Sequence, residues 1–163
     1  MKILYVGGQK SGKSRLASSK AVEIATKKPF YVATYDNSFN DASMQNRIEN
    51  HIKEREDMFE TIEEAYHLQK IIKPHETYVI DCISMWLFNN LSQSEEELKQ
   101  QLKEVCEQEA NIIFVLNNVN SGVIPFDSES RRFVDMSGII GQFLAQLCDE
   151  VIEVRYGLEV KLK

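Results

Sequence analysis

Short apolar runs alternate with amphipathic segments along most of the chain. The apolar runs predict buried strands at residues 3–6, 30–33, 77–81 and 111–116. Between the runs, apolar residues recur with helical spacing, as in helices that bury one face. This spacing predicts helices at residues 13–26, 41–55, 61–72, 83–91 and 94–109, the last opened by a capping box formed by Ser94 and Glu97.

The C-terminal third continues the alternation. One long helix is predicted from the apolar positions Phe133, Met136, Ile140, Phe143, Leu144 and Leu147. Two alternating segments, 152–156 and 158–162, flank Gly157 and predict a terminal hairpin. Strands that alternate with helices indicate an α/β fold with a mostly parallel central sheet, to which the hairpin adds antiparallel edges. No repeat or linker interrupts the pattern, so residues 1–163 are expected to form a single domain.

Composition narrows the possible partners and location. The formal net charge is −6 over 163 residues, which argues against nucleic acid and membrane surfaces because both are polyanionic. Three scattered cysteines without a CxxC pair are expected to be reduced thiols in a cytoplasmic protein. No apolar stretch approaches the roughly 18 residues of a membrane helix, and the first residues do not resemble a signal peptide.

The strongest chemical signal follows the first predicted strand. It reads Gly7-Gly8-Gln9-Lys10-Ser11-Gly12-Lys13-Ser14, and a predicted helix comes directly after it. Glycines let successive backbone N–H groups point at phosphate oxygens, and the helix N-terminus adds its positive end. Lys13 would reach the β- and γ-phosphates, and the Ser14 hydroxyl would ligate Mg²⁺. The chain is therefore predicted to be a P-loop enzyme that uses ATP or GTP.

Asp81 ends an apolar strand, and two interpretations of it are compatible. P-loop proteins often place an acid near the metal at such a position. An aspartate just before a predicted helix is equally typical of an N-cap.

Arg47, His51 and Arg55 share one face of a predicted helix, since they lie four residues apart. Two guanidinium groups can grip a triphosphate and keep the imidazole between them neutral, which leaves a ring nitrogen free to attack phosphorus. The alternative is a solvated surface histidine among charged neighbours. His67 and His75 are expected at the surface. No His/Cys/Asp set has zinc spacing, so Mg²⁺ is the only metal expected.

Several blocks in order along nearly the whole chain resemble the bifunctional adenosylcobinamide kinase/adenosylcobinamide-phosphate guanylyltransferases of cobalamin assembly. The blocks are the phosphate loop through Arg15, then Tyr31-Val32-Ala33-Thr34, then Arg47-Ile48-Glu49-Asn50-His51 with Arg55, and then 79–87 with Asn89-Asn90-Leu91. The C-terminal block comprises Asn117, Gly122, Pro125, Arg132, Phe133, Asp135, Gly138 and Asp149-Glu150-Val151.

The resemblance implies a RecA-like P-loop fold and two reactions. ATP or GTP phosphorylates the hydroxyl of the corrinoid adenosylcobinamide. GMP then passes from GTP through a covalent histidine intermediate to adenosylcobinamide phosphate. Carried over, His51 is the guanylylated residue. The residues implied around the nucleotide, besides the phosphate loop, are Ala33, Thr34, Tyr35, Arg47, His51, Ile52, Lys53, Glu54, Arg55, Glu63 and Asp81. The resemblance also implies a homo-oligomer, a trimer.

This sequence departs from the family pattern at Glu56, Asn118, Asn120, Val134 and Gly141. Apart from Glu56, these positions fall mainly where the resemblance places the corrinoid or the kinase chemistry. Two alternatives stay open beside the bifunctional enzyme. One is a P-loop small-molecule or nucleotide kinase without a covalent intermediate. The other is a GTP-binding sensor without turnover.

Overall fold

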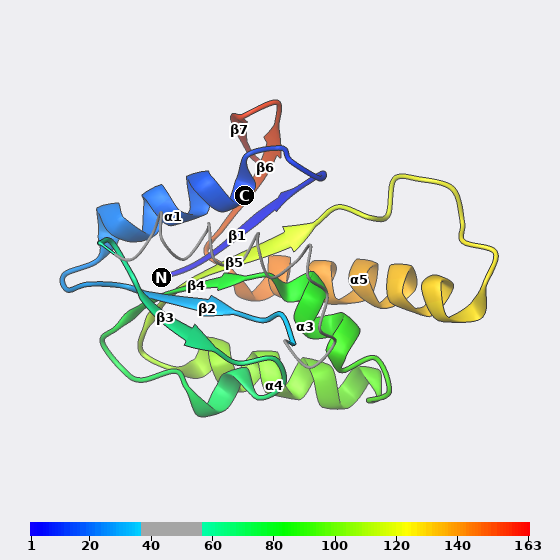
Figure 1. The fold of residues 1–163 in the computed structure, drawn as a ribbon, viewed down its shortest axis with the longest axis horizontal. Helices are drawn as coiled ribbons and strands as arrows, with labels where there is room; N and C mark the ends of the chain where they lie inside the picture. Colours follow the sequence, from blue (N-terminus) through cyan, green and yellow to red (C-terminus); the bar gives the residue numbers. More distant parts are fainter. Residues whose placement is uncertain (37–56) are drawn as a thin grey trace.

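A computed structural model describes residues 1–36 and 57–163. These residues form a seven-stranded sheet in the order β3-β2-β4-β5-β1-β6-β7 (Figure 1). The strands are β1 (Lys2–Gly7), β2 (Phe30–Ala33), β3 (Glu60–Glu63), β4 (Thr77–Asp81), β5 (Asn111–Asn117), β6 (Glu150–Arg155) and β7 (Leu158–Lys161). Every neighbouring pair is parallel except β6 with β7. The predicted α/β class with a mostly parallel sheet is confirmed.

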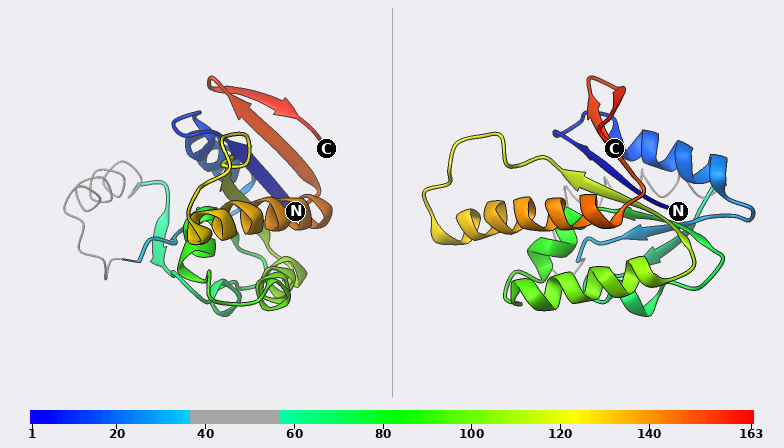
Figure 2. Two further views of the ribbon diagram at one scale, coloured as in Figure 1. Left: turned by 90° about the vertical axis from the view of Figure 1, so that its right-hand side faces the viewer. Right: turned by 180° about the vertical axis from the view of Figure 1, so that it is seen from behind.

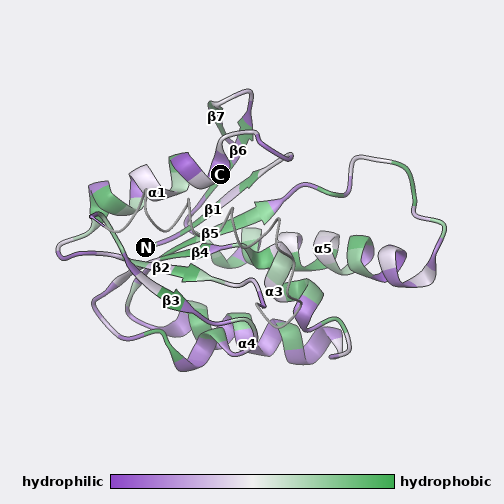
Figure 3. Ribbon diagram, in the orientation of Figure 1, coloured by the Kyte–Doolittle hydropathy of each residue, from purple (hydrophilic) through white to green (hydrophobic). Residues whose placement is uncertain are grey.

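Helices cover both faces of this sheet (Figures 1 and 2). Helix α1 (Lys13–Ile24) lies on one face, where Ala17 and Ala21 pack on the sheet. On the opposite face lie α3 (Ile83–Asn89), α4 (Glu95–Glu107) and α5 (Ser128–Leu147). Because the central strands are buried on both sides, they read as continuous apolar runs, which Figure 3 shows in green.

Most predicted elements are present with bounds shifted by one to a few residues. The capping box at Ser94 is formed, with Glu97 N–H and the Ser94 hydroxyl as partners at 3.3 Å. The C-terminal hairpin is also confirmed, but only β7 is antiparallel. Strand β6 runs parallel to β1, so the hairpin begins as a regular member of the parallel sheet.

The helix predicted over residues 61–72 is wrong. Glu60–Glu63 forms strand β3 at the sheet edge, paired with β2, and only Leu68–Lys70 makes a short 3-10 helix, η2. The buried Leu68 and Ile72 imitate helical spacing. Pairing with β2 overrides that local pattern, and an edge strand with three exposed residues carries no apolar alternation that could reveal it. The helix predicted over 41–55 lies outside the described residues.

The parallel strands bring their carboxyl ends to one edge of the sheet. Gly7 of β1 lies opposite Asn117 of β5, and Ala33 of β2 lies opposite Asp81 of β4. Loops that follow such ends form the usual ligand crevice of an open α/β sheet. In the described part of the chain, no helix is both long and apolar enough to cross a membrane.

Candidate active site at the carboxyl edge of the sheet

The predicted phosphate loop connects β1 to α1 at this edge. Its backbone turns through left-handed conformations at Lys10, with φ of 56°, and at Gly12, with φ of 97°. The N–H of Ser11 donates to the Gly8 carbonyl at 3.2 Å. Gly12 caps α1 without a side-chain hydrogen bond, and no acid occupies the first turn. The first N–H groups of α1 are therefore left for an anion, as phosphate binding requires.

Gly7 is packed so closely that a side chain does not fit. A Cβ atom there would lie 2.6 Å from the Ser11 Oγ and 2.7 Å from the Val154 carbonyl oxygen. The hairpin turn supports the loop from outside, because the N–H of Gly157 donates to the Ser11 carbonyl at 2.9 Å. Strands β1 and β6 and the hairpin turn together hold the loop in place.

Lys13 begins α1 and points back into its own loop. Its ammonium donates to the Gly8 carbonyl at 3.2 Å, and the residue is only 7% exposed. Burial lowers the pKa of Lys13, while the charge of Asp81 acts in the opposite direction. The structure thus brings Lys13 and Asp81, which are far apart in sequence, into one electrostatic environment.

Asp81 is half-buried at the end of β4, and its Oδ2 accepts a hydrogen bond from the Tyr31 hydroxyl. It is not the N-cap of α3. Cys82 holds that position, because the helix begins one residue later than a cap at Asp81 requires. The N-cap interpretation is wrong, and the interpretation as an acid beside the phosphate loop is the one the geometry supports.

The donors present fit Mg²⁺. This ion usually takes one or two protein oxygens together with substrate phosphates. The hydroxyl of Ser14, next to Lys13, and the carboxylate of Asp81 are hard oxygen donors of that kind. Among residues 1–36 and 57–163 there is no group of three His, Cys, Asp or Glu side chains that could hold a metal without such phosphates.

The other predicted residues at this edge differ in their surroundings. Thr34 is fully buried, and its hydroxyl donates to the Cys82 carbonyl and accepts from the Cys82 N–H, both at 2.8 Å. That hydroxyl is committed to holding β2 against the start of α3. Tyr35 follows it and is half-buried, and Glu63 is exposed at the end of β3.

One polar pair at the edge was assigned no role from the sequence. The N–H of Asn117 donates to the Ser84 Oγ at 2.9 Å, and the Asn117 amide approaches the Cys82 sulfur at 3.8 Å. Asn117 lies beside Gly7, at the start of the phosphate loop. The sequence does carry a signal for Asn117, because Asn117 is a polar residue that ends an apolar strand. The same feature identified Asp81.

Six predicted site residues lie outside the described residues: Arg47, His51, Ile52, Lys53, Glu54 and Arg55. Their proposed roles stay predictions. Both described histidines, His67 and His75, are exposed as predicted. The three cysteines are free.

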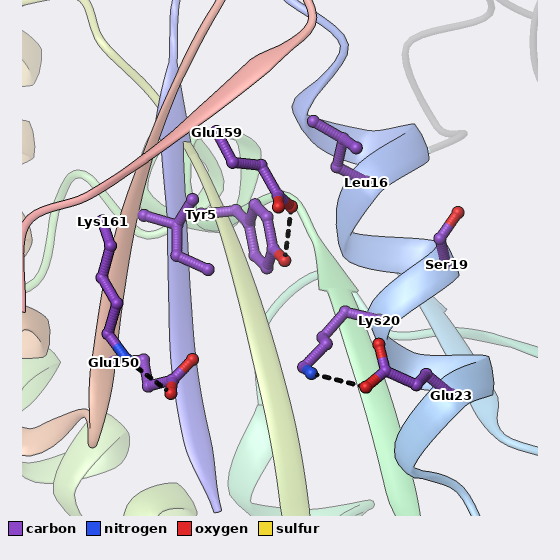
Figure 4. A pocket seen from close by; sticks show the side chains of 9 residues that line it. Tyr5, Leu16, Ser19, Lys20, Glu23, Glu150, Glu159 and Lys161 are labelled. Carbon is purple, nitrogen blue, oxygen red and sulfur yellow. Dashed lines mark hydrogen bonds and ion pairs between the residues drawn. The ribbon is translucent and has the colours of Figure 1, made fainter.

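A pocket of about 490 Å³ lies between α1 and the C-terminal hairpin (Figure 4). Its walls are internally paired: Tyr5 donates to Glu159 at 2.9 Å, and two lysine–glutamate pairs span 2.9 and 2.8 Å. No predicted site residue lines it. The phosphate loop, rather than this pocket, is therefore the candidate site.

Known proteins match this chain over nearly its whole length. The family model described as cobinamide kinase / cobinamide phosphate guanyltransferase matches residues 3–162. The bifunctional adenosylcobalamin biosynthesis protein CobP of Pseudomonas aeruginosa is 33% identical over 172 residues, covering all of this chain and 98% of the relative. The bifunctional adenosylcobalamin biosynthesis protein CobU of Escherichia coli is 29% identical over 185 residues, with both chains fully covered.

Among solved structures, the flagellar accessory protein FlaH from Methanocaldococcus jannaschii is similar with a TM-score of 0.55 and 15% identity. The match covers 99% of this chain and 77% of that one. Such a likeness establishes the fold alone, a RecA-like P-loop fold. The family match extends over almost every residue. The chain therefore belongs to the cobinamide kinase / cobinamide phosphate guanyltransferase family of cobalamin biosynthesis.

Proposed function

We propose that this protein is a bifunctional transferase that phosphorylates adenosylcobinamide with ATP or GTP and then transfers GMP from GTP to adenosylcobinamide phosphate. The observation that carries the proposal is the phosphate loop, in which Lys13 is buried within the electrostatic reach of Asp81. Membership of the family supplies the substrate class.

In the kinase step, the hydroxyl oxygen of the corrinoid side chain attacks the γ-phosphorus. A new P–O bond forms, the bond to the β-phosphate oxygen breaks so that the nucleoside diphosphate leaves, and the hydroxyl proton passes to water. Lys13 and the N–H groups at the start of α1 neutralise the growing charge on the phosphate oxygens. Mg²⁺, held by Ser14 with Asp81 nearby, would supply further positive charge to the β- and γ-oxygens.

In the guanylyl step, a ring nitrogen of His51 attacks the α-phosphorus of GTP. The N–P bond forms as pyrophosphate leaves, which gives a histidine–GMP phosphoramidate. A phosphate oxygen of the corrinoid then attacks the same phosphorus, forming a P–O–P linkage and releasing the histidine. Arg47 and Arg55 would grip the phosphates during both attacks.

We also propose that the protein is a homo-oligomer, a trimer, in the cytoplasm. Strand β7 supports association, because it lies at the sheet edge and carries the exposed apolar residues Leu158 and Val160, at 70% and 44%. Exposed apolar edge strands are surfaces that other chains can pair with. The free cysteines accord with a reducing compartment.

The test is to incubate the purified protein with Mg²⁺ and GTP radiolabelled at the α-phosphate, then to separate it on a denaturing gel. The wild type is expected to carry an acid-labile, alkali-stable label, as a phosphoramidate does. His51→Ala is expected to carry none while still binding GTP. Lys13→Met should bind less GTP and lose both reactions.

Three other results would reject parts of the proposal. Label retained in His51→Ala would place the covalent bond on another residue. Phosphorylated corrinoid without labelled protein would indicate a kinase without a covalent intermediate. GTP binding without any release of pyrophosphate or phosphate would indicate a sensor.

A further inference from the structure

The segment of residues 118–127, between β5 and α5, exposes an unusual amount of apolar surface. Val123 is 94% exposed, Ile124 80% and Phe126 101%. Figure 1 shows this loop projecting beyond the carboxyl edge of the sheet, and Figure 3 shows apolar residues along it. Apolar side chains gathered at one place on a surface commonly mark a binding site.

The loop begins in direct contact with the phosphate site. The N–H of Asn118 donates to the Gly7 carbonyl at 2.9 Å. The side chain of Asn118 then accepts from the Ser121 hydroxyl at 3.1 Å and from the Asn120 N–H at 3.3 Å. The first turn of the loop is therefore attached to the strand that carries the phosphate loop.

Helix α5 supports the rest of the loop. The Asn120 amide donates to the Val134 carbonyl at 2.8 Å. The Asn120 amide has room there because residue 138 is glycine. A Cβ at residue 138 would lie 2.8 Å from the Asn120 Nδ2. Arg131 donates to the Pro125 carbonyl at 3.1 Å and also to the Phe126 carbonyl.

Three departures from the family pattern, Asn118, Asn120 and Val134, thus belong to one hydrogen-bonded support. Their backbone and amide groups hold the loop, while its apolar side chains face outward.

We propose that Val123, Ile124 and Phe126 form the contact surface for the corrin ring of the second substrate. The inference rests on the proposed function and names the residues that select its corrinoid. The corrinoid must bring a hydroxyl or phosphate to the nucleotide at the carboxyl edge, and the loop projects from that edge. A corrin ring is a broad macrocycle rimmed with methyl and amide groups. Its apolar faces suit these side chains, and its amides suit the neighbouring Asn118, Asn120 and Ser121.

The test compares wild type with V123S/I124S/F126S and with the single variant Phe126→Ser. Val22→Ser serves as the matched control, since Val22 is also exposed, at 43%, but lies on α1. Equilibrium dialysis against cobinamide, followed by its visible absorbance, measures binding directly. Transfer kinetics give the KM for adenosylcobinamide phosphate, and labelling with GTP alone measures the step that needs no corrinoid.

We expect the triple variant to raise the KM for the corrinoid, and the Kd for cobinamide, at least roughly tenfold. Its labelling by GTP should stay within about twofold of wild type, and the control should match wild type in every assay. Because the three side chains are exposed, folding should be unaffected, and urea unfolding verifies this.

Unchanged corrinoid binding in the folded triple variant would overturn the inference, as would a wild type that does not bind cobinamide. Loss of oligomers in sedimentation, with corrinoid binding retained, would instead make the loop a contact between copies. If wild type binds cobinamide through the loop but is not labelled by GTP, the covalent function fails and the inference stands.

Discussion

Replacing Gly7 with alanine is expected to destabilise the folded protein and distort the phosphate loop, whereas alanine at the adjacent Gly8 is expected to be tolerated. The Cβ of Gly7→Ala would lie 2.6 Å from the Ser11 Oγ and 2.7 Å from the Val154 carbonyl oxygen. Nothing lies within 4 Å of a Cβ at Gly8. The two variants make the same chemical change at neighbouring positions, so any difference between them arises from packing.

The magnitude follows from which atoms must move. The Ser11 side chain could rotate, but the Val154 carbonyl belongs to the backbone of β6, which is paired with β1. Overpacking of this kind costs about 1–3 kcal/mol. For a chain of this size, each kcal/mol lowers Tm by roughly 2–4 °C. At Gly8 alanine can instead stabilise by up to about 1 kcal/mol, because it restricts the unfolded chain.

Urea unfolding followed by circular dichroism measures the free energy of unfolding. Calorimetric titration with GTP measures the affinity of the phosphate loop for the nucleotide. Gly7→Ala should lower both stability and GTP affinity, and adding Ser11→Ala should recover part of the stability by removing one of the two close contacts. Equal stability of Gly7→Ala and Gly8→Ala would refute the packing argument.

The remaining predictions concern buried ionisable groups. Lys13→Met should weaken GTP binding roughly 10–150-fold, the equivalent of one charge-assisted hydrogen bond, in calorimetric titration. The same change should raise the free energy of unfolding near neutral pH. Burial lowers the pKa of Lys13, so the charged ammonium destabilises the folded state at any pH below that pKa, and this cost fades as the pH rises toward the pKa of the unfolded chain. Burial raises the pKa of Cys82 and Cys106 to about 11 and that of Cys148 to about 12, so all three thiols should resist Ellman's reagent at pH 8 and react once the protein is unfolded. Stability should also fall as the pH rises above about 9, because the thiols of the unfolded chain then lose protons before those of the folded chain.

The sequence was most informative where local chemistry alone decides the structure. The phosphate-loop motif was recognisable because only glycine tolerates the φ of 97° at Gly12 and the close contacts at Gly7. The central strands were recognisable because burial on both faces requires continuous apolar runs, as in Ile112–Leu116. The Ser94 capping box is likewise a short-range feature.

Prediction failed where pairing partners come from distant parts of the chain. Glu60–Glu63 became a strand because the edge of β2 was available, although nothing in its own pattern indicated this. The sequence around Asp81 fits both an N-cap and an acid near the metal, and the start of α3 shows that Cys82 is the N-cap.

The fold class, the phosphate loop and the family could thus be predicted from the amino-acid sequence, because they depend on local backbone geometry and on ordered motifs. Which separated residues act together became visible in the folded chain. Folding brought Lys13 near Asp81 and placed Asn118 on the Gly7 carbonyl. It also joined Asn120, Val134 and Gly138 into the support of one exposed loop. Strand order and helix packing set these distances, and residues far apart in sequence carry no local pattern that indicates them.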